Sequence, residues 1–96
     1  MAEFMLTDDA KSDLVWLYRE GLELFGEHQA SVYLDEIYHL FELLAENPDL
    51  GFDFDIQGKK YQRYPHKGHV IIFEPAENNV KILRVFYGSS DYLGSL

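Results

Sequence analysis

Residues 10–44 carry apolar side chains at the spacing of two helices. Residues 3–6 (EFML) are predicted to form a short strand at a sheet edge. Thr7 is a favourable N-cap, and apolar residues follow it every three or four positions, at Ala10, Leu14, Leu17, Tyr18, Leu22 and Phe25. Gly26 is predicted to end this helix. A second helix follows, with an apolar face at Tyr33, Leu34, Ile37, Leu40, Phe41 and Leu44. Because Asn47-Pro48 ends it and almost no linker separates the two, an antiparallel hairpin is predicted.

After Pro48 the pattern changes to that of strands. Residues 52–55 (FDFD) alternate, but Gly51 and Gly58 bracket them, so they are predicted to form an ordered loop or a weak strand. Residues 60–66, 69–73 and 80–87 are predicted strands, with a turn at 75–79 (PAENN) and a break at 88–90 (GSS). We therefore predict a single α+β domain over residues 1–96, an N-terminal antiparallel helical hairpin packed on a small antiparallel β-sheet.

The last two predicted strands are apolar at nearly every position. Side chains on a strand alternate between faces, so both faces of these strands should be covered. The two helices can cover one face. The other is either an interaction surface or is sealed by the N-terminal strand and the C-terminal tail. The pattern leaves both readings open.

Composition narrows the cellular compartment in which we expect the protein. The 96 residues are 47% hydrophobic and include no cysteine, which is typical of a reducing compartment and excludes thiol chemistry. No apolar run has the length of a membrane span. Residues 1–6 are too short for a signal peptide. We expect a cytoplasmic protein that needs no cofactor and no membrane.

The net charge of −9 is unevenly distributed. Residues 1–50 hold two basic and twelve acidic residues, and residues 51–96 hold six basic and five acidic residues. Residues 59–69 (KKYQRYPHKGH) are the basic segment. An acidic chain argues against direct sequence-specific nucleic-acid binding, but a local basic strip suits a phosphate or an acidic partner.

The order of elements and several short motifs resemble the ParE branch of the RelE/ParE superfamily of bacterial toxins. The resemblance runs through Leu6-Thr7, Ala10-Lys11, Asp13-Leu14, Phe25-Gly26, Gln29-Ala30 and Tyr33-Leu34. It continues through residues 43–48 (LLAENP), Leu50-Gly51, Tyr64-Pro65, residues 69–71 (HVI), residues 82–85 (ILRV), Gly88 and Asp91.

The resemblance implies a toxin of a type II toxin–antitoxin module, functioning in plasmid or chromosome stabilisation. It implies a ParD-like antitoxin as partner and DNA gyrase as target, reached by binding rather than by catalysis. The alternatives are a ribosome-dependent mRNA interferase of the RelE type and an attenuated module that only binds its antitoxin.

Several positions depart from the family pattern. The family usually has arginine at Gln62, tyrosine-arginine at Phe73-Glu74, and histidine, a basic residue and methionine at Tyr87, Ser89 and Ser90. These losses bear on toxicity and on the choice between gyrase and the ribosome rather than on the fold.

The candidate target-binding residues are the cations Lys59, Lys60, Arg63, Lys67 and Arg84. The alternative for those at 59–67 is a solvated edge strand protected by lysines. The alternative for Arg84 is an ion pair with Glu74 or with a helix carboxylate, because an unpaired charge in a core is costly.

Two further residue sets follow from the resemblance. The candidate antitoxin contacts are Leu14, Leu17, Tyr18, Ile71, Phe73, Ile82 and Phe86. If the chain is a ribonuclease, the catalytic residues are Arg63, His69, Arg84 and Tyr87, with the tyrosine acting as a base beside cations.

Metal binding is not expected. Glu36 and His39 form one E-x-x-H pair where a di-metal site needs two, so both are predicted to face solvent. His66 and His69 lack an evident third ligand.

Overall fold

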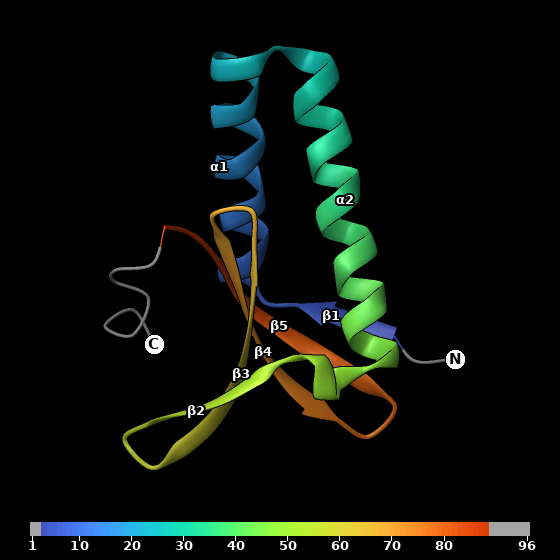
Figure 1. Cartoon of the computed structure of the whole chain (residues 1–96), viewed down its shortest axis with the longest axis vertical. Coiled ribbons are helices and arrows are strands. Elements are labelled where there is room, and N and C mark those ends of the chain that lie inside the picture. Colours follow the sequence, from blue (N-terminus) through green and yellow to red (C-terminus); the bar gives the residue numbers. More distant parts are fainter. Residues whose placement is uncertain (1–2, 89–96) are drawn as a thin grey trace.

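The computed structural model describes residues 3–88, which form two helices and one sheet (Figure 1). The elements in chain order are β1 (Glu3–Leu6), α1 (Asp8–Phe25), α2 (Glu27–Glu46), the short 3₁₀ helix η1 (Pro48–Leu50), β2 (Phe52–Ile56), β3 (Lys59–His66), β4 (His69–Ala76) and β5 (Asn79–Tyr87). This order confirms the predicted α+β class with an N-terminal helical hairpin.

The helices begin and end where the sequence predicts. The Thr7 side chain accepts a hydrogen bond from the Ala10 amide at 3.0 Å and caps α1. Gly26 separates the helices with a φ of 87°, a value that a side chain disfavours. A Cβ at Gly21 would lie 3.1 Å from the Ala30 Cβ, so small residues let the helices approach closely near the tip. None of the helices in residues 3–88 is long and apolar enough to cross a membrane.

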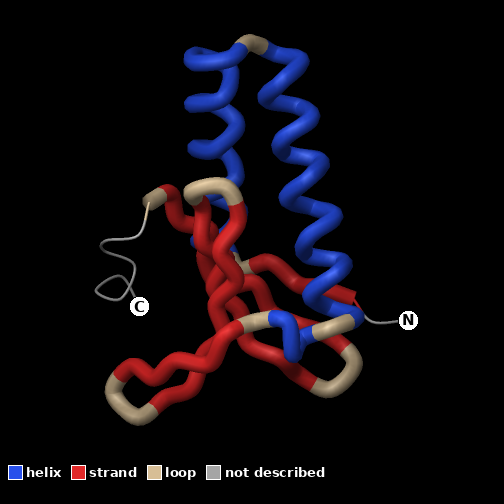
Figure 2. The backbone as a smooth tube through the Cα atoms, viewed as in Figure 1, coloured by secondary structure: helices blue, strands red, loops and turns tan. Residues whose placement is uncertain are grey.

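The five strands form one sheet in the order β1-β5-β4-β3-β2 (Figure 2). Strands β2 to β5 pair antiparallel, as predicted. The edge strand β1 instead pairs parallel with β5, so the sheet is mixed. Parallel pairing needs a long connection between the two strands, and the chain from β1 to β5, which includes α1 and α2, provides one.

The structure decides two strand predictions. Of the loop and the weak strand considered for residues 52–55, it has the strand, which spans residues 52–56 and pairs with β3 from Phe52–Arg63 to Ile56–Lys59. The basic strand β3 is therefore internal, with β2 and β4 on its two sides, and the edges of the sheet are β1 and β2. The predicted solvated edge at 59–67 is wrong for this reason, although many of its side chains stay exposed.

The core lies between the hairpin and one face of the sheet. Its largest fully buried side chains include Phe41 and Ile37 of α2 and Phe73 of β4. Ile71, Val80 and Ile82 complete the sheet side of the same cluster. Burying such side chains contributes about 1.5–3 kcal/mol each, which is the main source of stability in a domain of this size.

The exposed apolar surface lies on the helices rather than on the middle of the sheet. Val70 and Ile72 point away from the helical core, yet they are 7% and 0% exposed, so the far face is not bare there. Large exposed hydrophobic side chains occur on the hairpin instead, at Val15, Trp16, Leu22, Leu24, Phe25, Val32, Tyr38 and Leu43. In Figure 1 the hairpin stands upright and its tip extends beyond the sheet, so the sheet does not cover Leu24 and Phe25, which precede the tip at Gly26.

Candidate binding surfaces

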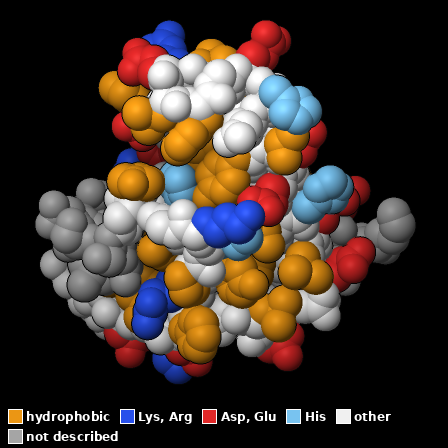
Figure 3. Space-filling view, turned by 45° about the horizontal axis from the view of Figure 1, so that its top comes forward, with side chains coloured by type: hydrophobic (Ala, Val, Ile, Leu, Met, Phe, Trp, Pro, Cys, Tyr) orange, Lys and Arg blue, Asp and Glu red, His pale blue; other side chains and the backbone are white. Residues whose placement is uncertain are grey.

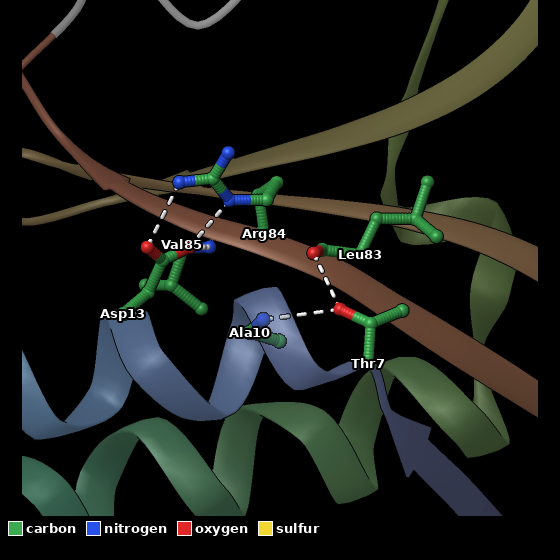
Figure 4. Close-up of polar contacts among 6 residues, drawn as sticks. All are labelled: Thr7, Ala10, Asp13, Leu83, Arg84 and Val85. Carbon is green, nitrogen blue, oxygen red and sulfur yellow. Dashed lines mark hydrogen bonds and ion pairs between the residues drawn. The ribbon is translucent and has the colours of Figure 1, made fainter. Parts of the chain in front are cut away.

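Where β5 extends beyond β1, its backbone groups form hydrogen bonds with side chains of α1 and of the α1 cap (Figure 4). Pairing with β1 ends at Ile82, where a bulge shifts the register of β5. The Thr7 hydroxyl donates to the Leu83 carbonyl at 2.8 Å, and Asp13 accepts a hydrogen bond from the Val85 amide at 2.9 Å. These side chains replace the missing ladder bonds, because buried backbone groups need partners.

Arg84 completes this arrangement. Its Nε and Nη2 atoms donate to the two carboxylate oxygens of Asp13 at 2.8 and 3.0 Å. The hydrogen bond from Arg84 to Asp13 raises the pKa of Arg84. Its guanidinium also lies 4.4 Å from the centre of the Phe86 ring. Arg84 is thus paired with a helix carboxylate, one of the two acids considered from the sequence. The other acid, Glu74, pairs with Lys59 at 3.1 Å.

An apolar trench runs between α1 and the ends of β4 and β5. Two hollows of about 380 and 190 Å³ share the walls Leu17, Glu20, His69 and Tyr87 and so form one trench. We call this the α1–β5 trench; its other lining residues include Asp13, Trp16, Leu24, Phe25, Ala30, Tyr33 and Phe86. Trp16, Leu24, Phe25 and Tyr87 are 65%, 70%, 65% and 76% exposed, unusually high values for such side chains. Hydrophobic side chains also gather over the hairpin on the face shown in Figure 3.

A tyrosine and a histidine meet on the wall of the trench. The Tyr33 hydroxyl lies 2.8 Å from His69 Nδ1. Burial raises the pKa of Tyr33 to about 12, with the Glu36 charge adding to the effect. Burial lowers the pKa of His69, against the opposing influence of Glu20. Tyr87 packs edge-on against His69, with ring centres 5.1 Å apart. The Tyr33–His69 contact joins α2 to the start of β4, next to the β3–β4 turn.

Glu36 adds a second link between α2 and that turn. Its carboxylate lies 3.0 Å from the Lys67 ammonium and 3.2 Å from His66 Nε2. The hydrogen bonds from Lys67, with His66 close by, lower the pKa of Glu36. Glu36 remains in contact with solvent, with its side chain 36% exposed, while it also pairs with Lys67, and His39 is exposed as expected.

The five candidate target-binding cations do not form one patch of free charge. Arg84, Lys59 and Lys67 are paired with Asp13, Glu74 and Glu36. Lys60 and Arg63 make no ion pair within the described residues. Arg63 lies over the Phe52 ring at 5.7 Å. The free cations thus sit on the projecting β2–β3 hairpin.

Two positions that depart from the family pattern have partners of their own. The Gln62 amide hydrogen-bonds Asp53 across β2 and β3. Glu74 holds Lys59. Ser89 and Ser90 lie outside the described residues.

The four candidate ribonuclease residues separate into two groups. His69 and Tyr87 pair in register at the end of the sheet and face the trench. Arg63 and Arg84 flank Ile72 on the other face, and Arg84 is engaged by Asp13. The structure does not bring the four side chains to one point. Within residues 3–88, no three His, Asp or Glu residues come together as a metal site would require.

The candidate antitoxin contacts divide in a similar way. Ile71, Phe73 and Ile82 are 0% exposed within the core and present no surface to a partner. Leu17 and Phe86 line the α1–β5 trench. Leu14 and Tyr18 line a different groove, on the opposite side of α1.

Sequence reasoning placed Tyr33 on the apolar face of the second helix and Asp13 among the family motifs, but it did not assign Asp13, Trp16 or Tyr33 to a site. A signal existed for Asp13, which lies three residues after Ala10 and four before Leu17, within the apolar stripe of α1. A carboxylate in that stripe needs a buried partner. Trp16 and Tyr33 carried no comparable signal, because their role depends on where β4 and β5 end.

Comparisons with known proteins agree with this architecture. The family model described as "ParE toxin of type II toxin-antitoxin system, parDE" matches residues 4–92. Toxin ParE1 of Caulobacter vibrioides is 31% identical over 91 residues, covering 93% of this chain and 92% of that protein.

Two solved structures share the fold. One, described as the chromosomal ParDE TA system from P. aeruginosa, has a TM-score of 0.75 at 18% identity, covering 93% of this chain and 98% of the other. The other is a conserved hypothetical protein from Helicobacter pylori, with a TM-score of 0.60 at 16% identity, covering 91% and 94% of the two chains.

Proposed function

Because this chain belongs to the ParE toxin family of type II toxin–antitoxin systems, we propose that a ParD-like antitoxin neutralises it by occupying the α1–β5 trench. The observation that carries the proposal is the exposure of Trp16, Leu24, Phe25 and Tyr87 along the two adjoining hollows of this trench. Exposed aromatic and aliphatic side chains around a groove are typical of a surface that receives an apolar helix.

The trench also has a rigid frame. The Asp13–Arg84 pair holds α1 to β5, and the Tyr33–His69 contact holds α2 to β4. A preformed groove lowers the entropic cost of binding, because its walls need no ordering. This supports a partner that supplies the flexible segment and orders it on the toxin.

The antitoxin proposal is tested with the ParD-like protein expected from a neighbouring open reading frame. Leu24→Asp should weaken binding by about 2 kcal/mol or more, since it places a charge in the centre of the apolar contact. Val32→Asp is the control, because Val32 is 54% exposed but lies outside the trench. Equal binding by the two variants would reject the trench as the site.

Trp16 supplies an internal reporter of the same event. It is the single tryptophan of the chain and lines the trench. Antitoxin binding should shift its emission to shorter wavelength as the indole leaves water. An unchanged spectrum at saturating antitoxin would place the partner elsewhere.

We also propose a cytoplasmic, non-catalytic toxin that acts by binding DNA gyrase. The separation of the candidate ribonuclease residues supports binding over catalysis. Lys60 and Arg63 on the β2–β3 hairpin are the cations best placed for target contact, since the others are paired.

Two assays of the purified protein, gyrase supercoiling and in vitro translation, distinguish a gyrase inhibitor from an mRNA interferase and from an attenuated module that only binds its antitoxin. Stalled supercoiling supports the gyrase proposal. Cleaved messages with intact supercoiling would instead establish an interferase, and no effect in either assay with antitoxin binding retained would establish an attenuated module.

A further inference from the structure

The face of the sheet that points away from the helices carries aromatic rings and cations together. The strand register places Phe52 opposite Arg63, and Arg63 opposite Ile72, which points away from the helical core. Phe54 and Tyr61 form the next pair on this face, two positions along each strand. We call Phe52, Phe54, Tyr61 and Arg63 the outer platform.

The rings of the outer platform are in contact with cations and with one another. The Arg63 guanidinium lies 5.7 Å from the centre of the Phe52 ring, and the Lys59 ammonium lies 5.4 Å from that of Tyr61. The rings of Phe54 and Tyr61 have centres 5.8 Å apart. Phe52 is 56% exposed, and Tyr61 and Arg63 are half-buried. These contacts hold the rings in place and leave part of their surface open to a ligand.

Strand alternation keeps negative charge of the β2–β3 hairpin off the outer platform. Its two carboxylates, Asp53 and Asp55, occupy the alternate positions of β2 and so point to the other face. The β2–β3 hairpin also projects at the end of the molecule opposite the helix tip (Figure 1). Exposed charges more than about 10 Å apart are largely screened at 0.1 M salt. An anion at the platform is therefore opposed less than the net charge of −9 suggests.

The chemistry of this face favours stacking over simple charge attraction. Lys59 pairs with Glu74, which leaves Arg63 as a platform cation without an ion pair within residues 3–88. An acidic peptide would gain little from one unpaired cation. Unpaired nucleobases, in contrast, stack on aromatic rings and on guanidinium planes, and each base presents such a surface.

A second copy of the chain is a poor occupant of this edge of the sheet. If β2 of two molecules paired antiparallel about Phe54, Asp53 of each copy would lie opposite Asp55 of the other. Like charges would then meet at both ends of a five-residue strand. Charge therefore opposes self-association through β2.

We propose that the outer platform binds single-stranded nucleic acid without sequence preference. Neighbouring bases stack on Phe52 and Tyr61, and Arg63 contacts a phosphate between them. The two rings occupy diagonal positions on paired strands, about 7–8 Å apart, which leaves room for one base on each. This activity goes beyond the proposed function and depends on neither the antitoxin nor gyrase.

The first test measures binding of labelled oligonucleotides by fluorescence anisotropy, with no gyrase present. The probes are a short mixed-sequence DNA strand, the same strand annealed to its complement, and the RNA of the same sequence. The single strands should bind at least about tenfold more tightly than the duplex, whose bases are already stacked on one another. Binding of DNA, RNA or both identifies the sugar that the platform accepts. Failure of both single strands to bind, equal binding of the duplex, or equal binding of a polyglutamate peptide overturns the proposal.

The second test separates stacking from other effects of mutation. Phe52→Ala and Tyr61→Ala should each weaken single-strand binding by about tenfold, whereas Phe52→Tyr and Tyr61→Phe, which keep a ring, should stay within about twofold of the native chain. Phe25→Ala is the control, because Phe25 is 65% exposed but lies at the helix tip. Urea midpoints of all variants verify that they fold. Equal losses in the alanine variants and in those that keep the ring would reject stacking.

The third test uses salt. One or two phosphate contacts predict a shallow slope of about −0.7 to −1.4 for the logarithm of affinity against that of salt concentration. Arg63→Gln should bring the slope closer to zero by about 0.7, whereas Arg19→Gln, which removes an exposed cation of α1, should leave it unchanged. A slope steeper than about −3 would show that charge rather than stacking holds the strand, and would overturn the proposal.

Discussion

Asp13 and Arg84 are 71 positions apart in the sequence and form a two-pronged ion pair between α1 and β5. Their side chains are 14% and 22% exposed, so water screens the pair only partly. The same carboxylate accepts the Val85 amide, which β1 is too short to satisfy. One side chain therefore joins the first helix to the last strand at the wall of the trench.

Removing the Asp13 charge should destabilise the fold. Asp13→Asn leaves a half-buried guanidinium without its counter-charge, and we expect a loss of about 2 kcal/mol in the free energy of unfolding. Urea denaturation at neutral pH measures it. The control Asp35→Asn removes an exposed charge of α2 and should change the value by less than about 0.5 kcal/mol. Equal losses in both variants would show that the pair contributes nothing.

Thr7 should be sensitive to loss of its hydroxyl rather than to its shape. That hydroxyl accepts from the Ala10 amide and donates to the Leu83 carbonyl. Thr7→Val keeps the size but removes both bonds and should cost about 1–2 kcal/mol. Thr7→Ser keeps the hydroxyl and should stay within about 0.5 kcal/mol of native. Thermal or urea denaturation compares them, and a more stable valine variant would contradict the assignment.

His69 should make stability fall as the pH drops below about 6.5. Burial lowers its pKa in the folded chain, so the unfolded chain takes up a proton more readily and acid favours unfolding. The effect is at most about 1.4 kcal/mol per pH unit. The pKa of Glu36 is lowered in the folded chain, so Glu36 stabilises the fold at neutral pH. That stabilisation is lost only as the pH falls below 4.5, the ordinary pKa of a glutamate.

Urea midpoints at about pH 7.5 and 5.5 measure the His69 effect. His69→Gln should reduce the difference between the two midpoints. His28→Gln, which replaces an exposed histidine near the hairpin tip, should retain it. Identical pH dependence in the native chain and His69→Gln would exclude His69 as the titrating group.

Gly51 should not accept a side chain. A Cβ there would lie 2.6 Å from the Cζ atom of Phe73, whose ring is fully buried. Gly51→Ala should cost about 1–3 kcal/mol through overpacking. Combined with Phe73→Leu, which removes the ring edge, the alanine should cost less than it does alone. Strict additivity of the two changes in unfolding experiments would rule out the contact as the cause.

The helical half was predictable because its signals are local. Apolar spacing, the Thr7 cap, the break at Gly26 and the stop at Asn47-Pro48 act within a few residues. The strands at 60–66, 69–73 and 80–87 were likewise predicted from short-range pattern. Residues 52–56 were harder, because alternating phenylalanine and aspartate become a strand only when β3 pairs with them.

The candidate surfaces were less predictable. The sequence indicated Leu17 and Phe86, which line the trench, but it also indicated Ile71, Phe73 and Ile82, which are buried in the core. Apolar periodicity predicts which side chains are buried, but it does not predict whether the core or a partner protein buries them. Phe25 is the last residue of α1 and is exposed because the hairpin tip extends beyond the sheet, which is a property of tertiary arrangement.

The sequence by itself determined the hairpin and the three predicted strands, because these depend on neighbours three, four or two residues away. It also determined the uneven charge, which follows from composition alone. Tertiary structure decided the parallel pairing of β1, the internal place of β3 and the partner of Arg84. It also placed Lys11 and Arg19 on one groove. These features join residues distant along the chain, or face a surface that exists only after the helices pack. Local pattern carries no record of that geometry.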